Sequence, residues 1–259
     1  MQVLTIGKRV IIQLKGDRRF LILSLIAPVI VIYLLKLLLD VIEQQPLPGM
    51  KGLLPIAAPS ISLNGFVMPA TAFIVHFISF VLCAILLVQE RTEGTFERML
   101  ISGYRKTSII AGYTLGYFGL ATLQAIISLA EAVWLFELKF DTQTIVLLFS
   151  VIWILAIVSV MLGIFVSTFA RHEGQVFPFI PLIILPSVFL TGVIVDPVRL
   201  PRWAEYTGYL FPLRYANNII DTISKNGYHF HEVSLNFSIL IGYAVALWLI
   251  ASKTLRETE

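Results

Sequence analysis

Long apolar stretches separated by short polar segments dominate the hydropathy pattern of this chain. A helix needs about 20 apolar residues to cross a hydrocarbon core of roughly 30 Å. Six stretches reach or approach that length, and we predict a membrane-spanning helix in each: residues 20–39, 66–88, 109–136, 144–169, 176–195 and 235–251. The pattern therefore predicts an all-α membrane protein with six transmembrane helices, organised as one domain over residues 1–259.

The composition agrees with this class and excludes others. Hydrophobic residues make up 58% of the chain and charged residues 14%, and the mean hydropathy is +0.87. Soluble domains carry about 25% charged residues, so this chain is too apolar to be surrounded by water. A net charge of +3 gives no basic surface for nucleic acid. Cys83 is the single cysteine, so neither a disulfide framework nor a Cys/His metal cluster is expected.

Basic residues concentrate on one side of the predicted topology. Those in the N-terminal segment, the second and fourth loops and the C-terminal tail are Lys8, Arg9, Lys15, Arg18, Arg19, Arg91, Arg98, Arg105, Lys106, Arg171, Lys253 and Arg256. The first and third loops contain only Lys51 and Lys139. The fifth loop is long and partly hydrophobic, so its basic residues count for less. Because basic loops mark the cytoplasmic side, we predict a multi-pass protein of the cell membrane with both termini in the cytoplasm.

Two segments outside the spans are predicted to lie at the membrane surface. Residues 1–19 place apolar side chains at helical spacing opposite lysines and an arginine, which favours an interfacial helix over a frayed basic terminus. Residues 40–65, rich in proline, are predicted to form an irregular outer connection. Residues 196–234 are predicted to contain helices at 201–210 and 212–223 that dip into the outer leaflet. Their aromatic and proline residues are either structural or part of an outer gate: Trp203, Tyr206, Phe211, Pro212 and Tyr215.

The segment 90–104, between the second and third spans, carries the most informative pattern. Thr95 occupies an N-cap position after Gly94, and a short helix is predicted to follow. Phe96 and Met99 then share one helical face, which we expect to be exposed, with Glu97 off that face. A helix lying in the membrane interface and a docking surface for a soluble partner both fit this pattern.

Chemical motifs for catalysis are missing from the sequence. It has no P-loop, no nucleophile elbow and no His-Glu-x-x-His string. Of the sparse polar residues inside the spans, His76 is the one candidate for a substrate or proton contact, although the pattern favours a packed histidine that is hydrogen-bonded to a neighbouring helix. Gly112-x-x-x-Gly116 supplies small residues that permit close helix approach.

Two stretches resemble a known family. Glu90-Arg91-x-x-Gly94-Thr95-x-Glu97-Arg98-Met99-Leu100 resembles the signature of the ATP-binding-cassette type-2 exporter permeases. Gly163, Ser167, Pro186, Thr191-Gly192, Pro201-x-Trp203 and Pro212-Leu213-x-Tyr215 extend the resemblance over nearly the whole chain. The chain departs from the family pattern where Thr191-Gly192 replaces the usual Ser-Gly, and Val193-Ile194-Val195 is less aromatic than usual.

The resemblance implies a half-transporter that pairs with an identical or related permease in membrane lipid. A separate ATPase subunit would bind ATP and Mg and power export, so this chain would be no enzyme and hold no cofactor. The coupling helix that docks on the ATPase would present Glu90, Arg91, Gly94, Thr95, Phe96, Glu97, Arg98, Met99 and Leu100. An amphipathic drug, natural product or lipid-like compound would pass between the second and fifth spans, near His76, Phe80, Pro186, Phe189 and Thr191.

Two other classes of protein remain possible on the residues alone. A stand-alone channel or ion-coupled carrier requires a polar pathway, for which His76, Gln124 and Glu131 are the available residues. An intramembrane enzyme requires several acids or a Ser/His pair at one depth, and the sequence offers no such set. Transport by the purified chain without ATP would indicate the channel or carrier class.

Overall fold

The computed structural model describes residues 2–44, 63–226 and 230–254, and over these ranges it contains helices and no strands. Six candidate membrane spans are present in the described ranges, which confirms the predicted count. They correspond to α2 (Arg18–Gln44), α3 (Leu63–Thr92), α5 (Lys106–Leu135), α6 (Thr142–Ser167), α7 (Phe179–Leu190) with the preceding turn η3 (Glu173–Gln175), and α10 (Phe230–Thr254).

Several helix ends differ from the predicted ones. α3 continues to Thr92, so Glu90 and Arg91 belong to this long helix, and the predicted helix over 90–104 shrinks to α4 (Thr95–Ile101). α7 is shorter than the predicted span 176–195, because it starts after Pro178 and ends before Gly192, whose φ of 96° is incompatible with a right-handed helix. The predicted outer connection 40–65 lies mostly outside the described residues.

α3 and α6 form the centre of the bundle. The most apolar stretch of α3 is 67% buried and that of α6 is 56% buried, compared with 17% for α2 and 11% for α10. Gly163 of α6 allows the two central helices to approach closely, because a Cβ there would lie 2.7 Å from the carbonyl oxygen of Phe80. The outer helices α2, α7 and α10 expose many apolar side chains, as a surface that faces lipid or another membrane subunit does.

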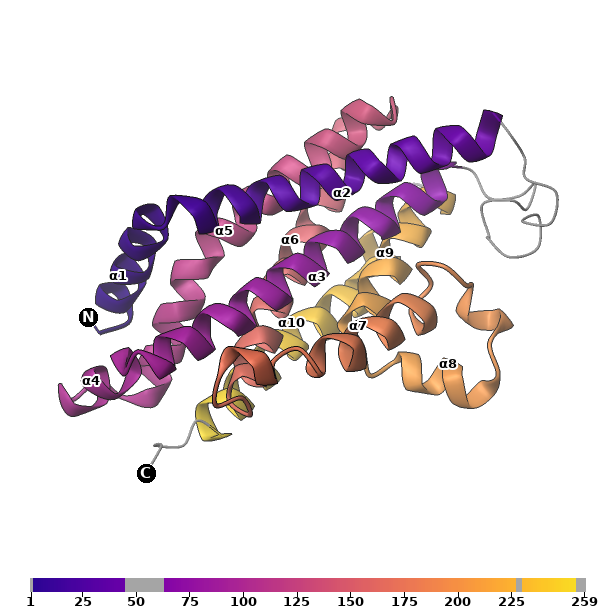
Figure 1. The fold of residues 1–259 in the computed structure, drawn as a ribbon. Helices are drawn as coiled ribbons and strands as arrows, with labels where there is room; N and C mark the ends of the chain where they lie inside the picture. Colours follow the sequence, from indigo (N-terminus) through magenta and orange to yellow (C-terminus); the bar gives the residue numbers. More distant parts are fainter. Residues whose placement is uncertain (1, 45–62, 227–229, 255–259) are drawn as a thin grey trace.

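The two ends of the bundle carry different short helices. α1 (Gln2–Gly16), α4 and the C-terminal end of α10 lie at one end, which we call the α4 end; α8 (Arg202–Gly208) and the far ends of α2 and α5 lie at the other, the α8 end (Figure 1). α9 (Pro212–Asn226) follows α8 and packs against α3, α6 and α10. α8 and α9 thus lie close to the helices predicted at 201–210 and 212–223. α9 belongs to the interior of the bundle and does not lie on its surface as predicted.

Candidate functional site

Short turns hold α4 between the ends of α3 and α5. Gly94 is the N-cap of α4, with a φ of 69°, and no side chain caps the helix there. The prediction that Thr95 is the N-cap is therefore wrong: a left-handed turn requires glycine at this point, and Thr95 becomes the first helical residue. Its hydroxyl accepts a hydrogen bond from Nη2 of Arg98 at 3.0 Å. Gly103, with a φ of 82°, then turns the chain towards α5.

The two faces of α4 have opposite surroundings. Phe96 and Met99 share a face as predicted, but they are 5% and 8% exposed, so the expectation that they are exposed is wrong. That face joins the hydrophobic core because it turns inward towards α1 and α3. Glu97 and Arg98 point outward, and Ile101 is 87% exposed. The surface that α4 presents is thus a mixed-charge pair beside one exposed isoleucine.

Glu90 joins three helices inside the α4 end. Its carboxylate accepts hydrogen bonds from Nη2 of Arg9 in α1 at 3.1 Å and from the hydroxyl of Tyr113 in α5 at 2.8 Å. Arg9 also donates from Nη1 to the sulfur of Met99 in α4 at 3.4 Å. Partial burial by itself lowers the pKa of Arg9, but Tyr113 and the Glu90 carboxylate more than offset this and raise it. Glu90 is 3% exposed and lies inside the protein rather than on its surface.

Arg91 is also turned inward. Its Nη1 donates to the carbonyl oxygens of Ser167 at 2.7 Å and of Ala170 at 3.5 Å, where α6 ends. An arginine at this place satisfies carbonyl groups that have no partner within the helix. Glu90 and Arg91 are therefore neighbours in the signature that bind α3 to different helices.

Two glycines of α5 form the surface against which α1 packs closely. A Cβ at Gly112 would lie 2.5 Å from Cβ of Ile6, and one at Gly116 would lie 2.5 Å from Cβ of Val10. The close approach predicted for Gly112-x-x-x-Gly116 is thus made by α1, a helix that itself was predicted to lie in the membrane interface. Residues 1–19 contain that helix from Gln2 to Gly16.

The predicted pathway residues lie in different surroundings. Phe189 is 48% exposed and Pro186 is half-buried, while the other three are buried: His76, Phe80 and Thr191. Nδ1 of His76 lies 2.6 Å from the hydroxyl of Ser159 in α6, so this histidine bonds to a neighbouring helix, and its Nε2 has no partner among the described residues. The five side chains do not form one exposed surface.

The predicted gate residues divide in the same way. Trp203 and Tyr206 on α8 are about 70% exposed, Phe211 and Tyr215 are half-buried, and Pro212 is buried. Two further polar residues are buried in α9 and tie this region together, although the sequence analysis did not single them out.

Arg214 and Asn217 link α9 to the end of α7. Nη1 of Arg214 donates to the carbonyl oxygen of Leu190 at 3.4 Å, and the guanidinium lies 4.9 Å from the ring centre of Tyr209. The amide of Asn217 donates to the carbonyl oxygen of Thr191 at 3.1 Å. A polar residue at helical spacing among buried apolar ones was the available sequence signal, because a buried polar group requires a partner.

The six long apolar helices define a polytopic membrane protein. Comparison with known sequences assigns its family. The ABC-2 type transporter family profile matches residues 1–223, so the chain belongs to that family. It is 24% identical over 204 residues to ABC transporter G family member 20 of Dictyostelium discoideum, covering 78% of this chain and 28% of that protein.

Two bacterial relatives are also similar. The probable multidrug ABC transporter permease YbhR of Escherichia coli is 24% identical over 166 residues, covering 64% of this chain and 45% of that protein. The linearmycin resistance permease protein LnrN of Bacillus subtilis is 22% identical over 170 residues, covering 66% of this chain and 44% of that protein. The chain thus spans less than half the length of each of these three relatives.

Proposed function

We propose that this chain is the membrane-spanning permease of an ATP-driven exporter. It would pair with a second permease and move an amphipathic drug, natural product or lipid-like compound outward, and a separate ATPase subunit would dock on α4. The α4 end would face the cytoplasm, as the distribution of basic residues predicts. The relatives named as multidrug and resistance permeases support this substrate class.

The observation that carries the proposal is the two-faced packing of α4. Its inner face is anchored through Met99 and Phe96, while Glu97, Arg98 and Ile101 point outward. A surface of charged residues around an exposed apolar side chain suits a protein partner. Of the docking residues expected from the signature, we therefore propose that those on the outward face of α4 contact the ATPase.

The contacts of Glu90 provide a route for movement. A displacement of α4 reaches α3 through a short turn, and Arg9 contacts both Glu90 and Met99. Because Tyr113 bonds to the same carboxylate, α1, α3, α4 and α5 would move as one unit. This unit would transmit closure of the ATPase to the central helices, and the contacts of α9 with α7 would open at the α8 end.

The test is a charge reversal on the outer face of α4. The tagged chain is purified in mild detergent from its own host, and the co-purifying ATP hydrolysis is measured with and without the combined Glu97→Arg and Arg98→Glu changes. We expect the variant to lose about tenfold or more of the bound ATPase, as removal of an interface hot spot does. Glu137→Arg, an exposed acid beyond the other end of α5, is the matched control and should retain it.

Two results would overturn the proposal. One is an unchanged amount of bound ATPase in the charge-reversed variant, which would exclude the outer face of α4 as the docking site. The other is solute transport by the purified chain alone in liposomes without ATP, which would indicate a stand-alone channel or carrier.

A further inference from the structure

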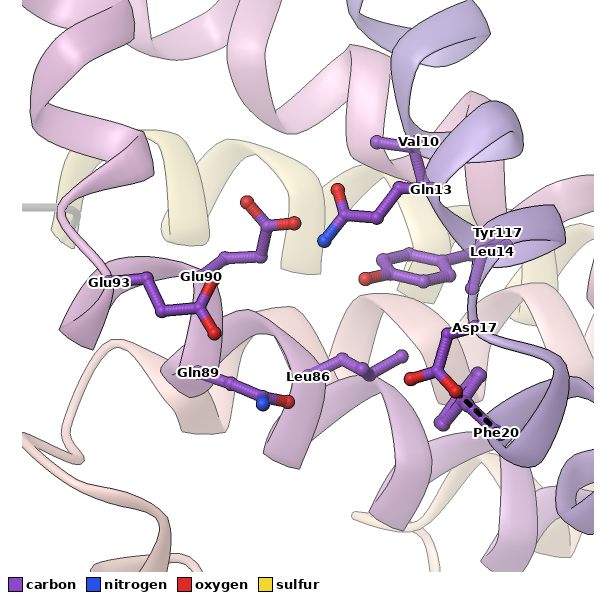
Figure 2. A pocket seen from close by; sticks show the side chains of 10 residues that line it. All are labelled: Val10, Gln13, Leu14, Asp17, Phe20, Leu86, Gln89, Glu90, Glu93 and Tyr117. Carbon is purple, nitrogen blue, oxygen red and sulfur yellow. Dashed lines mark hydrogen bonds between the residues drawn. The ribbon is translucent and has the colours of Figure 1, made fainter.

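A pocket of about 140 Å³ lies where α1 meets α2, against the end of α3 and the middle of α5. We call it the elbow pocket; its lining side chains are drawn in Figure 2. Leu14, Phe20 and Leu86 contribute apolar surface, and Asp17, Glu90 and Glu93 contribute carboxylates. It therefore combines an apolar wall with acidic groups at the α4 end of the bundle.

The charge of the elbow pocket is not balanced by its own lining. None of its 10 lining residues is basic. Glu90 has Arg9 as its partner, but among the described residues neither Asp17 nor Glu93 makes an ion pair. Among the described residues, the one hydrogen bond that the Asp17 carboxylate accepts comes from the backbone N–H of Phe20, at 3.0 Å. Two carboxylates thus remain to attract a cation into the pocket.

Tyr117 provides an independent sign of a ligand. Its side chain is 4% exposed and its hydroxyl points into the elbow pocket (Figure 2). No hydrogen bond joins this hydroxyl to another side chain or carbonyl group in the described part of the chain, so it can bond to a molecule in the pocket. A smaller hollow of about 10 Å³ shares Phe20, Leu86 and Tyr117 with the pocket and extends beside Cys83. An acceptor-rich pocket with an apolar extension suits a ligand that donates hydrogen bonds from a charged head.

We propose that the elbow pocket binds a protonated organic amine with an apolar body and loads it for export. Its ammonium N–H groups would donate to Tyr117, Asp17 and Glu93, and its apolar body would lie against Phe20 and Leu86. A cavity of about 150 Å³ holds a benzene molecule, so the pocket accommodates a ring-sized group. That the bound amine is then exported rests on the proposed function, whereas the binding itself requires this chain alone.

The test measures binding to the full chain in phosphatidylglycerol nanodiscs without any ATPase, with empty discs subtracted. Benzylammonium is the probe, benzyl alcohol and benzoate are its neutral and anionic counterparts, and benzyltrimethylammonium is a cation without N–H donors. We expect benzylammonium to bind most tightly and benzoate not at all. Asp17→Asn and Glu93→Gln should each weaken its binding up to about fivefold, and together by roughly tenfold.

The variants separate a site from a general effect of charge. Asn still caps α2 at position 17, so Asp17→Asn keeps the fold while removing the charge. Glu137→Gln removes the same charge at the α8 end and should leave the affinity unchanged. Tyr117→Phe should reduce the preference for benzylammonium over benzyltrimethylammonium. Equal binding of benzyl alcohol, or an affinity unaffected by the double acid change, would overturn the proposal.

A lipid headgroup could supply the same ammonium chemistry, and the disc composition distinguishes the two sources. An affinity that stays constant when phosphatidylethanolamine is mixed into the discs supports a soluble amine as the occupant. Loss of benzylammonium binding in those discs would mean that the lipid headgroup fills the pocket, which overturns the loading assignment. Because no ATPase is present, failure of the docking test on α4 would leave this result untouched.

Discussion

Two sets of interhelical contacts, one at each end of the bundle, use different kinds of hydrogen bond. At the α4 end, the side chains of Glu90, Arg9 and Tyr113 bond to one another across three helices. At the α8 end, Arg214 and Asn217 donate to main-chain carbonyl oxygens at the end of α7. A side-chain acceptor is lost in one substitution, whereas a main-chain carbonyl remains whatever the residue. The contacts of Glu90 therefore depend on the side chains of both partners in each bond, whereas the contacts between α9 and α7 depend on the side chains of the donors alone.

The largest expected effect comes from lifting α1 off α5, which would dismantle the α4 end. Gly116→Leu places a branched side chain where Val10 packs, and overpacking of this kind costs up to about 3 kcal/mol. Thermal unfolding of the purified chain in detergent measures it. Gly119→Ala on the same helix is the control, since nothing lies within 4 Å of a Cβ there. Equal stability of the two variants would show that α1 does not sit on this glycine face.

The next effect tests whether Arg9 and Glu90 act as a pair. Arg9→Gln and Glu90→Gln should each destabilise the chain by about 1.5–3 kcal/mol, because each removes a charge-assisted hydrogen bond. The double variant should lose less than the sum, with a coupling free energy of about 1 kcal/mol. Chemical unfolding of the original chain, the two single variants and the double variant measures these losses and the coupling free energy. Additive losses would mean that the 3.1 Å contact contributes nothing of its own.

A smaller loss of stability is expected at the α8 end. It should follow from removing the donor side chain, and much less from changing the residue whose carbonyl oxygen accepts. Asn217→Ala removes the donor to the carbonyl oxygen of Thr191 and should cost about 1 kcal/mol. Thr191→Val keeps that carbonyl oxygen and should cost clearly less. The same unfolding measurement applies to both variants. If Thr191→Val were the more damaging change, the hydroxyl rather than the carbonyl would be the relevant acceptor.

The smallest effect concerns an acid whose hydrogen bonds, within the described ranges, are all made to residues close to it in the chain. Asp141 caps α6 and accepts hydrogen bonds from Thr144, which lower the pKa of its carboxyl. Its contribution to stability is therefore present above the unfolded-state pKa and is lost as the pH falls through the lower folded-state value. We expect no change in Tm from this group between pH 7 and about 5, and a slight fall only below about 4. Asp141→Asn should remove that slight fall, and a variant with an identical acid profile would contradict the assignment.

Local patterns predicted the spans and the position of the signature, but not the direction in which its side chains point. The spacing of Phe96 and Met99 gave a shared face, and only the packing of α1 and α3 turned that face inward. Glu90 bonds to Arg9, 81 positions earlier in the chain, and no local pattern pairs two such residues. The burial of α9 was missed for the same reason, because its aromatic and proline residues are equally typical of a membrane surface.

The sequence by itself determined the class of this protein and the number of its candidate spans. Apolar runs of about 20 residues belong in a membrane wherever they occur in a chain, and the signature at Glu90–Leu100 resembles one family independently of any contact. Only the tertiary structure decided that Glu90 and Arg91 hold helices together, that α1 rests on Gly112 and Gly116, and that the elbow pocket exists. Each of these arises where segments distant in the chain meet, and the free energy of such contacts depends on geometry that a local pattern does not contain.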